Sequence, residues 1–155
     1  QVLDQVLELE ALDQGMTISV LETVQNQIAV FSGMAEADMV KLVRQIVADA
    51  EKGGVDAYVG AYFEAVTERY LAGDLAGILA LSREQLPGND AGLNARLMTR
   101  LIDDRNRRFA ARLGATLPAG GAFVAVGALH LPGQAGLIAL LEAEGYRVTL
   151  VERLK

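Results

Sequence analysis

The single histidine of the chain, His130, is a candidate for metal binding or general-base chemistry. It lies in the stretch Gly-Ala-Leu-His-Leu-Pro-Gly over 127–133, where a predicted strand ends and a predicted helix begins. Ligands of open α/β sheets bind at that edge. The positive end of the helix would disfavour imidazolium, and metals and protons bind the neutral ring. We name Gly127 and Gly133, which permit tight turns and close approach, as candidate substrate-binding residues. The alternative is a histidine that only closes a loop.

A guanidinium and an amide form a second candidate group, at 105 and 106. Polar residues over 103–108 interrupt a predicted helix, and at ~100° per residue Arg105 falls near the centre of its apolar face. We therefore expect Arg105 to point inward, where it needs a carboxylate, backbone carbonyls or an anionic ligand. Asn106 lies about a quarter-turn away and is placed to line the same cleft. The alternatives are an internal salt bridge or an arginine that snorkels along the helix edge.

A carboxylate at the end of another predicted strand is the third candidate. Glu22 closes the β-branched segment 17–22, and Gln27 follows it on the polar side of a predicted helix. If this strand runs parallel to the one before His130, Glu22 and His130 emerge at the same edge of the sheet. The alternative is an ordinary helix start, with Thr23 as N-cap and Glu22 in solvent.

The elements that would hold these side chains follow from hydrophobic periodicity and turn signals. Strands are predicted over 17–22, 122–126 and 146–151, and a loop over 86–90. Helices are predicted over 1–13, 24–31, 36–52, 55–71, 74–81, 92–113 and 132–144.

The order of these elements predicts a fold class. The last two strands and the helix between them predict a right-handed βαβ unit with parallel strands, which needs helices on both faces. We expect one α/β domain over 1–155, helix-rich with a small, mainly parallel sheet. Three strands are few for so many helices, and the sequence starts abruptly at Gln1. We therefore expect an incomplete half of a larger α/β domain.

Composition excludes several classes of function. The chain has no cysteine, so it has no disulfide, thiolate nucleophile or cysteine metal site. A net charge of −6 and the lack of tryptophan argue against nucleic-acid binding. We find no run of about 18 apolar residues and no signal peptide, so we expect no transmembrane segment.

The candidate residues also occur in an order that resembles a known family. The chain resembles the TraB/GumN family, which includes the pheromone-shutdown proteins and is related to the Tiki metalloproteases, over the C-terminal half of the family domain. The resemblance rests on Leu21-Glu22-Thr23 with Gln27, on Arg105-Asn106, on the stretch 123–133, and on Gly136, Leu140-Leu141 and Gly145-Tyr146.

This resemblance implies a G-x-x-H motif, Gly127 to His130, with a second such motif and an acidic residue in the N-terminal half. In the Tiki branch these groups are associated with divalent-metal-dependent peptide cleavage, here with Zn, Mn or Co. His130 would be a metal ligand and Glu22 a ligand or base. Arg105 and Asn106 would hold the substrate or orient Glu22, and Gln27 would contact the substrate.

The chain departs from that pattern, because the second motif is absent and catalytic zinc usually has three protein ligands. We therefore expect a metal-dependent, peptidase-like hydrolase that is inactive as this chain alone, or that gains its other ligands from a missing N-terminal half or another chain. The alternative is a non-catalytic module of the cell envelope that binds a peptide or a small ligand. The resemblance places the protein in the periplasm or cell envelope. A structural role for 36–84 is a third reading, in which exposed apolar faces lead to self-association.

Overall fold

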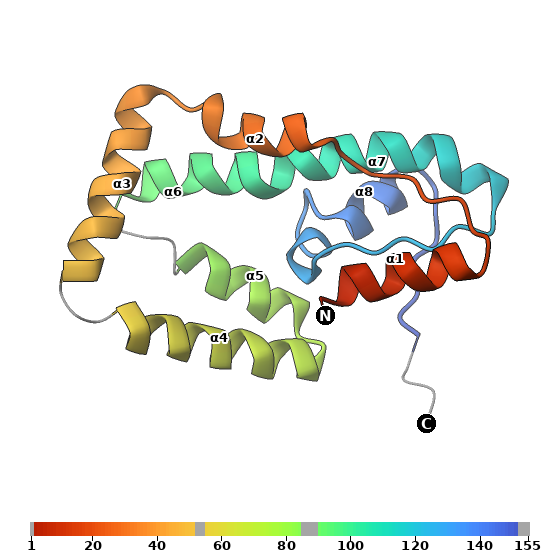
Figure 1. Ribbon diagram of the computed structural model, residues 1–155, viewed down its shortest axis with the longest axis horizontal. Helices are drawn as coiled ribbons and strands as arrows, with labels where there is room; N and C mark the ends of the chain where they lie inside the picture. The colour runs from red at the N-terminus through yellow and green to blue at the C-terminus, as the bar shows by residue number, and fades with distance from the viewer. Residues whose placement is uncertain (1, 52–54, 85–89, 152–155) are drawn as a thin grey trace.

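The computed structural model describes residues 2–51, 55–84 and 90–151, and every regular element within them is a helix (Figure 1). The α-helices are α1 (Leu3–Asp13), α2 (Val24–Ser32), α3 (Glu36–Glu51), α4 (Val55–Ala72), α5 (Leu75–Glu84), α6 (Ala91–Met98), α7 (Asp104–Thr116) and α8 (Leu137–Ala143). A π-helical turn, η1 (Thr99–Asp103), joins α6 to α7, and the 3-10 turns are η2 (Leu117–Ala119) and η3 (Ala128–His130). None of the described helices has the length and apolarity needed to cross a membrane.

One long rod organises the molecule. The elements α6, η1 and α7 follow one another without a break, and α2 lies along the rod in Figure 1. Helix α8 packs against α7, where Phe109, Ala110 and Leu113 form a core cluster with Leu137. Burying each large apolar side chain of such a cluster contributes about 1.5–3 kcal/mol. A second cluster joins α3 to α6 through Leu42, Leu93 and Leu97.

Helix α2 is fixed at both ends, and this positions the residues just before it. At its start the Thr23 hydroxyl accepts a hydrogen bond from the Asn26 backbone N–H, and the Asn26 side chain accepts one from the Thr23 N–H. At its end the Arg100 guanidinium donates to the carbonyls of Val30 and Ala29, at 2.8 and 3.0 Å. These bonds satisfy backbone groups that a helix end otherwise leaves unpaired.

The predicted α/β fold is wrong. The segments 17–22, 122–126 and 146–151 contain no strand, and with them the parallel sheet and the βαβ unit are absent from the described residues. The β-branched residues did predict extended backbone, but a strand also needs a neighbour that takes up its N–H and C=O groups. Instead the first two segments lie against helices, with Leu21 and Val126 packed on the α7–α8 cluster.

The helix predictions are confirmed for α1 to α7, but the last predicted helix is shorter than expected. It begins at Leu137 rather than at 132, after a turn. In that turn Gly133 has a φ of +89°, and a Cβ on Gly136 would collide with the carbonyl oxygens of Leu131 and Pro132. Most of the predicted loop 86–90 lies outside the described residues, and its last residue, Asp90, is the N-cap of α6.

Candidate functional site

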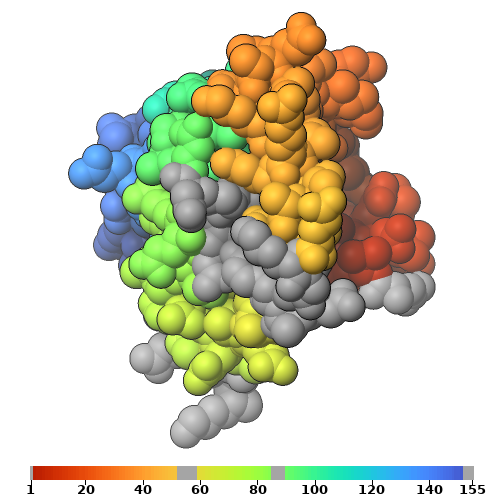
Figure 2. Space-filling view, turned by 90° about the vertical axis from the view of Figure 1, so that its left-hand side faces the viewer, coloured from red at the N-terminus to blue at the C-terminus, as the bar shows by residue number. Residues whose placement is uncertain are grey.

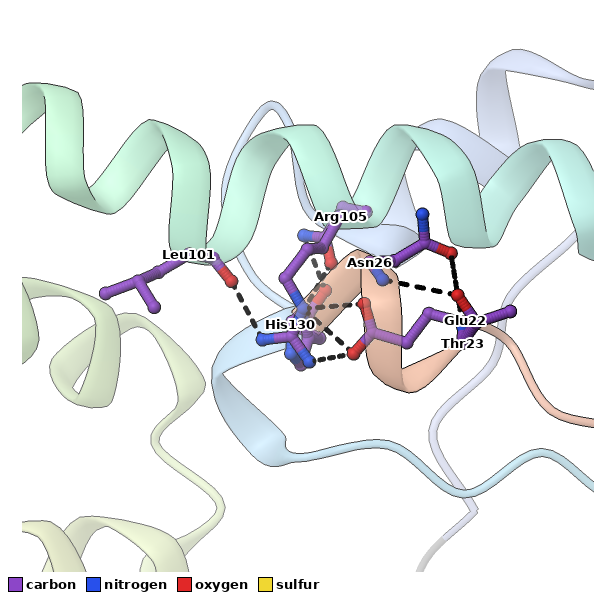
Figure 3. Close-up of polar contacts among 7 residues, drawn as sticks. Glu22, Thr23, Asn26, Leu101, Arg105 and His130 are labelled. Atoms are coloured by element: carbon purple, nitrogen blue, oxygen red, sulfur yellow. Dashed lines mark hydrogen bonds and ion pairs between the residues drawn. The ribbon is translucent and has the colours of Figure 1, made fainter. Parts of the chain in front are cut away.

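An ion pair between Glu22 and Arg105 lies at the centre of the candidate site (Figure 3). The Arg105 Nη2 atom is 2.5 Å from Glu22 Oε1, and Nε is 3.1 Å from both carboxylate oxygens. Only 6% of the Glu22 side chain is exposed, against 21% for Arg105. Arg105 therefore points inward, as predicted. Of the alternative reading, Thr23 is the N-cap of α2, but Glu22 is not in solvent. A guanidinium fork on a carboxylate is a strong and directional contact.

The π-helical turn before α7 gives Arg105 a second acceptor. Arg105 Nη1 donates to the Leu101 carbonyl at 3.0 Å. Its guanidinium carbon also lies 5.5 Å from the centre of the Phe109 ring, one turn further along α7. π turns inside α-helices are frequent at functional sites. The guanidinium is thus held by a carboxylate, a carbonyl and an aromatic face.

His130 is held by Asn106, which is fully buried. The Nδ1 atom of His130 is 2.6 Å from the Asn106 side-chain oxygen. The Asn106 side-chain nitrogen donates to the carbonyls of His130 and Ala135, at 3.2 and 2.8 Å. The Phe109 ring, which Arg105 also contacts, lies 5.2 Å from the imidazole.

These contacts fix the tautomer of the histidine. Two carbonyls can only accept, so the atom of Asn106 that faces them must be its nitrogen, and the atom that faces His130 is its oxygen. This oxygen also only accepts, so Nδ1 of His130 carries the proton and Nε2 keeps its lone pair. A ring with a free Nε2 lone pair can bind a metal or take a proton.

The surroundings of His130 favour its neutral form. Burial lowers the pKa of His130, the positive charge of Arg105 lowers it further, and Glu22 partly opposes them. The sequence also predicted a neutral ring, but for a different reason, because it placed His130 at a helix N-terminus. His130 instead ends the turn η3, and α8 begins only at Leu137.

Glu22 remains ionised despite its burial. Burial alone would raise the pKa of Glu22, but the hydrogen bond and the charge of Arg105 outweigh it and lower that pKa. A hydrogen bond from Gln27 and the charge of Arg108 act in the same direction. The sequence named Gln27 as a substrate contact. In the structure its side chain forms a hydrogen bond with Glu22.

The structure places Glu22, Gln27 and Arg105 in one hydrogen-bonded group and Asn106 and His130 in a second, and the Phe109 ring contacts both Arg105 and His130. The two glycines named from the sequence lie on the loop that carries His130. Gly127 has an ordinary φ of −59°, and a Cβ added there would lie 3.8 Å from the imidazole, so its backbone does not require glycine.

Sequence reasoning missed three parts of the site: the Leu101 carbonyl, the Phe109 ring and the close approach at Gly136. Of these, the Phe109 ring could have been predicted from the sequence. Phe109 comes four residues after Arg105, and residues four apart on a helix are neighbours. A π-helical turn has no comparable local signal.

The described residues offer only part of a metal site. They contain no group of three or more histidine, cysteine, aspartate or glutamate side chains placed to hold one ion. His130 and Glu22 are suitable donors, but both oxygens of Glu22 already accept from Arg105, whose positive charge repels a cation. Two donors fall short of the three that catalytic zinc usually has.

Comparison with known proteins identifies the family of the chain. A family model described as the TraB/PrgY/gumN family matches residues 1–150. The chain belongs to this family. The resemblance inferred from the sequence is thereby confirmed, although membership by itself establishes no activity. No curated protein and no solved structure gave a significant match.

Proposed function

We propose that this member of the TraB/PrgY/gumN family contributes His130 and Glu22 to a metal-dependent, peptidase-like hydrolase centre. The observation that carries the proposal is the Asn106 amide, which holds His130 with Nδ1 protonated and Nε2 open. Histidine ligands of metals characteristically donate their other ring N–H to a fixed acceptor. Asn106 supplies that acceptor here.

The remaining residues have supporting roles in this proposal. Arg105 orients the Glu22 carboxylate, whose Oε1 atom accepts from both Nε and Nη2 of Arg105 and whose Oε2 atom accepts from Nε alone, so Oε2 is the oxygen less occupied by the guanidinium. Gln27 donates to the same carboxylate. A divalent ion of the Zn, Mn or Co type would polarise a peptide carbonyl or activate water. Because two donors are too few, further ligands would come from outside the described residues, and we expect no hydrolysis by the chain alone.

A Zn²⁺ titration tests the proposal directly. The ¹⁵N signal of His130 Nε2 is expected to shift on addition of Zn²⁺, since this is the atom with the lone pair. Calorimetry should show affinity reduced roughly tenfold or more by His130→Ala. The matched control is Arg107→Ala, whose side chain is 58% exposed on α7. Equal affinity in the wild type and in His130→Ala would remove His130 from the metal site and refute the proposal.

A binding module is the second candidate, and one observation favours it. Both oxygens of Glu22 are engaged by Arg105, so the pair is already neutralised without a metal. In this case the cluster would serve to hold the His130 loop next to a bound peptide or small ligand. Lack of any Zn²⁺ effect on Nε2, together with an unchanged fold, is the result expected for this alternative.

A further inference from the structure

Two arginines of α7 hold the chain just before α2. Arg105 binds the Glu22 carboxylate, and Arg112 Nη1 donates to the Val20 carbonyl at 3.2 Å. The two arginines are seven residues apart, so at ~100° per residue they lie about 20° apart around the helix axis. They therefore face this part of the chain from the same side of α7.

Arg100 holds the other end of α2. Its Nε and Nη2 atoms donate to the carbonyls of Val30 and Ala29, at 2.8 and 3.0 Å. In Figure 1 α2 lies along the rod, and in Figure 2 the orange surface of α2 and α3 adjoins the green surface of α6. Because Arg100 precedes α7 in the rod and contacts the last residues of α2, α2 runs antiparallel to the rod. Arg100, Arg105 and Arg112 thus form one row, which we call the arginine row.

The π-helical turn η1 aligns Arg100 with the other two arginines. On a regular α-helix Arg100 and Arg105 would lie about 140° apart, because they are five residues apart. In η1 the Asp104 N–H instead bonds to the Thr99 carbonyl, five residues back. This bonding places residues five apart on the same side, as the α-helical bonds do for residues four apart. The turn therefore acts as one extra residue within the arginine row.

Gly33 leaves the space that the Arg100 guanidinium occupies. A Cβ at this position would overlap the Arg100 Nη2 atom and lie 3.0 Å from the Ala29 carbonyl oxygen. The φ of Gly33 is −88°, so its backbone conformation does not require glycine. The guanidinium that fills this place therefore explains why a side chain is excluded there.

We propose that Arg100 is a positioning residue for Glu22, acting through α2, and that η1 brings it into the arginine row. Thr23 caps α2 directly after Glu22, so a shift of α2 along the rod moves the carboxylate with it. By fixing the far end of α2, Arg100 sets how Glu22 meets Arg105. Glu22 is a ligand or base only under the proposed function, whereas its placement is tested below without a metal, so failure of one is distinguishable from failure of the other.

Hydrogen exchange at the Arg105 Nε–H, which donates to both oxygens of Glu22, tests this placement. The signal is identified by its absence from Arg105→Lys. Arg100→Gln and Gly33→Ala are both expected to raise its exchange rate roughly tenfold, because each releases the far end of α2. The backbone amide of Leu113, in the core of α7, should exchange at an unchanged rate. This comparison separates loss of position from a general loss of stability.

The matched control is Arg96→Gln. Arg96 is also an arginine of the rod, but it pairs with Asp38 of α3, at 2.7 Å. The Arg105 Nε–H should therefore remain protected in this variant. An unchanged rate in Arg100→Gln, an equal increase at Leu113, or the same increase in Arg96→Gln overturns the positioning role of Arg100.

Deletion of one residue tests the role of η1. Removing Asp103 leaves Arg100 and Arg105 four residues apart, which is a same-side spacing on a regular α-helix. The Arg105 Nε–H should therefore stay protected. Removing Ala111, at an exposed position of α7, is the control and should sharply lower the melting temperature, because it turns Leu113 about 100° out of the core. Loss of the fold or of Arg105 protection after removal of Asp103 overturns the aligning role of η1.

Discussion

The Asn106 side chain makes three contacts that no smaller residue could replace. It joins the ring of His130 to the carbonyls of His130 and Ala135 in a buried environment. Each buried polar group that loses its partner costs about 1–3 kcal/mol. Asn106 therefore contributes to stability and also determines which nitrogen of His130 is protonated.

Replacing this amide should destabilise the protein strongly. We expect Asn106→Leu to lower the free energy of unfolding by roughly 2–4 kcal/mol, because two carbonyls and an imidazole N–H lose their partner. Urea unfolding measures the change. Arg107→Ala, at the next and exposed position, should cost less than about 0.5 kcal/mol. Equal and small effects of the two changes would contradict the assigned contacts.

The Glu22–Arg105 pair should behave differently from an exposed pair on the same helix. Glu22→Gln leaves the Arg105 charge in a half-buried position and should cost roughly 2 kcal/mol. Asp104→Asn breaks the exposed Arg107–Asp104 pair and should cost less than about 0.5 kcal/mol. Urea unfolding of both variants at low ionic strength tests the contrast, and similar losses would indicate that burial of the first pair is energetically unimportant.

The His130 pKa also makes stability depend on pH. Because its folded-state pKa lies below the ordinary value of 6.5, the unfolded chain binds more protons as the pH falls. Stability is thus present above about pH 6.5 and is lost as the pH falls toward the folded-state pKa. The lowered pKa of Glu22 adds a further loss below about 4.5. Unfolding measured between pH 7.5 and 5.5 should show a smaller loss for His130→Gln than for the wild type, and an identical loss would contradict this assignment.

The sequence allowed the inward position of Arg105 to be predicted, because its place on the apolar face follows from local helical periodicity. It did not identify Glu22 as the partner. The two residues are 83 positions apart, and no local spacing pairs them. The expected meeting point of Glu22 and His130, a shared sheet edge, was wrong, because the described residues contain no sheet. The Phe109 ring instead contacts both His130 and Arg105, the partner of Glu22.

At the scale of the elements, helices were predictable and strands were not. Helices such as α3 form their backbone hydrogen bonds within themselves, so the periodicity of their own residues is sufficient to identify them. A strand depends on a distant partner, and the extended segment 122–126 has none among the described residues. The apolar run predicted a buried strand in this segment, but Phe123 is 76% exposed. An apolar run alone therefore did not establish burial.

The turn before α8 provides a prediction about glycine. Gly136→Ala should destabilise the protein by more than about 2 kcal/mol, because its Cβ would meet two backbone carbonyls that cannot move aside. Gly127→Ala should change stability by less than about 1 kcal/mol, because its nearest neighbour is at 3.8 Å and its φ is ordinary. Thermal unfolding compares the two, and comparable effects would show that the turn relaxes around the new methyl group.

At the scale of the whole molecule, the site depends on the convergence of three distant segments on one rod. Glu22 precedes α2, Arg105 and Asn106 lie on α7, and His130 ends η3. Among the described residues, α3 is joined to the rod through Leu42 and the Asp38–Arg96 and Lys41–Asp90 ion pairs. Family membership could be inferred from the order of the motifs, whereas the arrangement of the helices could not, because it rests on long-range contacts.

The most direct test uses the fact that the chain has one histidine, so its ring signals need no assignment by mutation. Long-range ¹H–¹⁵N correlation at pH 7 should show His130 neutral, with the proton on Nδ1 and an unprotonated Nε2, and Asn106→Leu should disturb this pattern while Arg107→Ala leaves it intact. A ring protonated at Nε2, or an imidazolium at that pH, would contradict the proposed site.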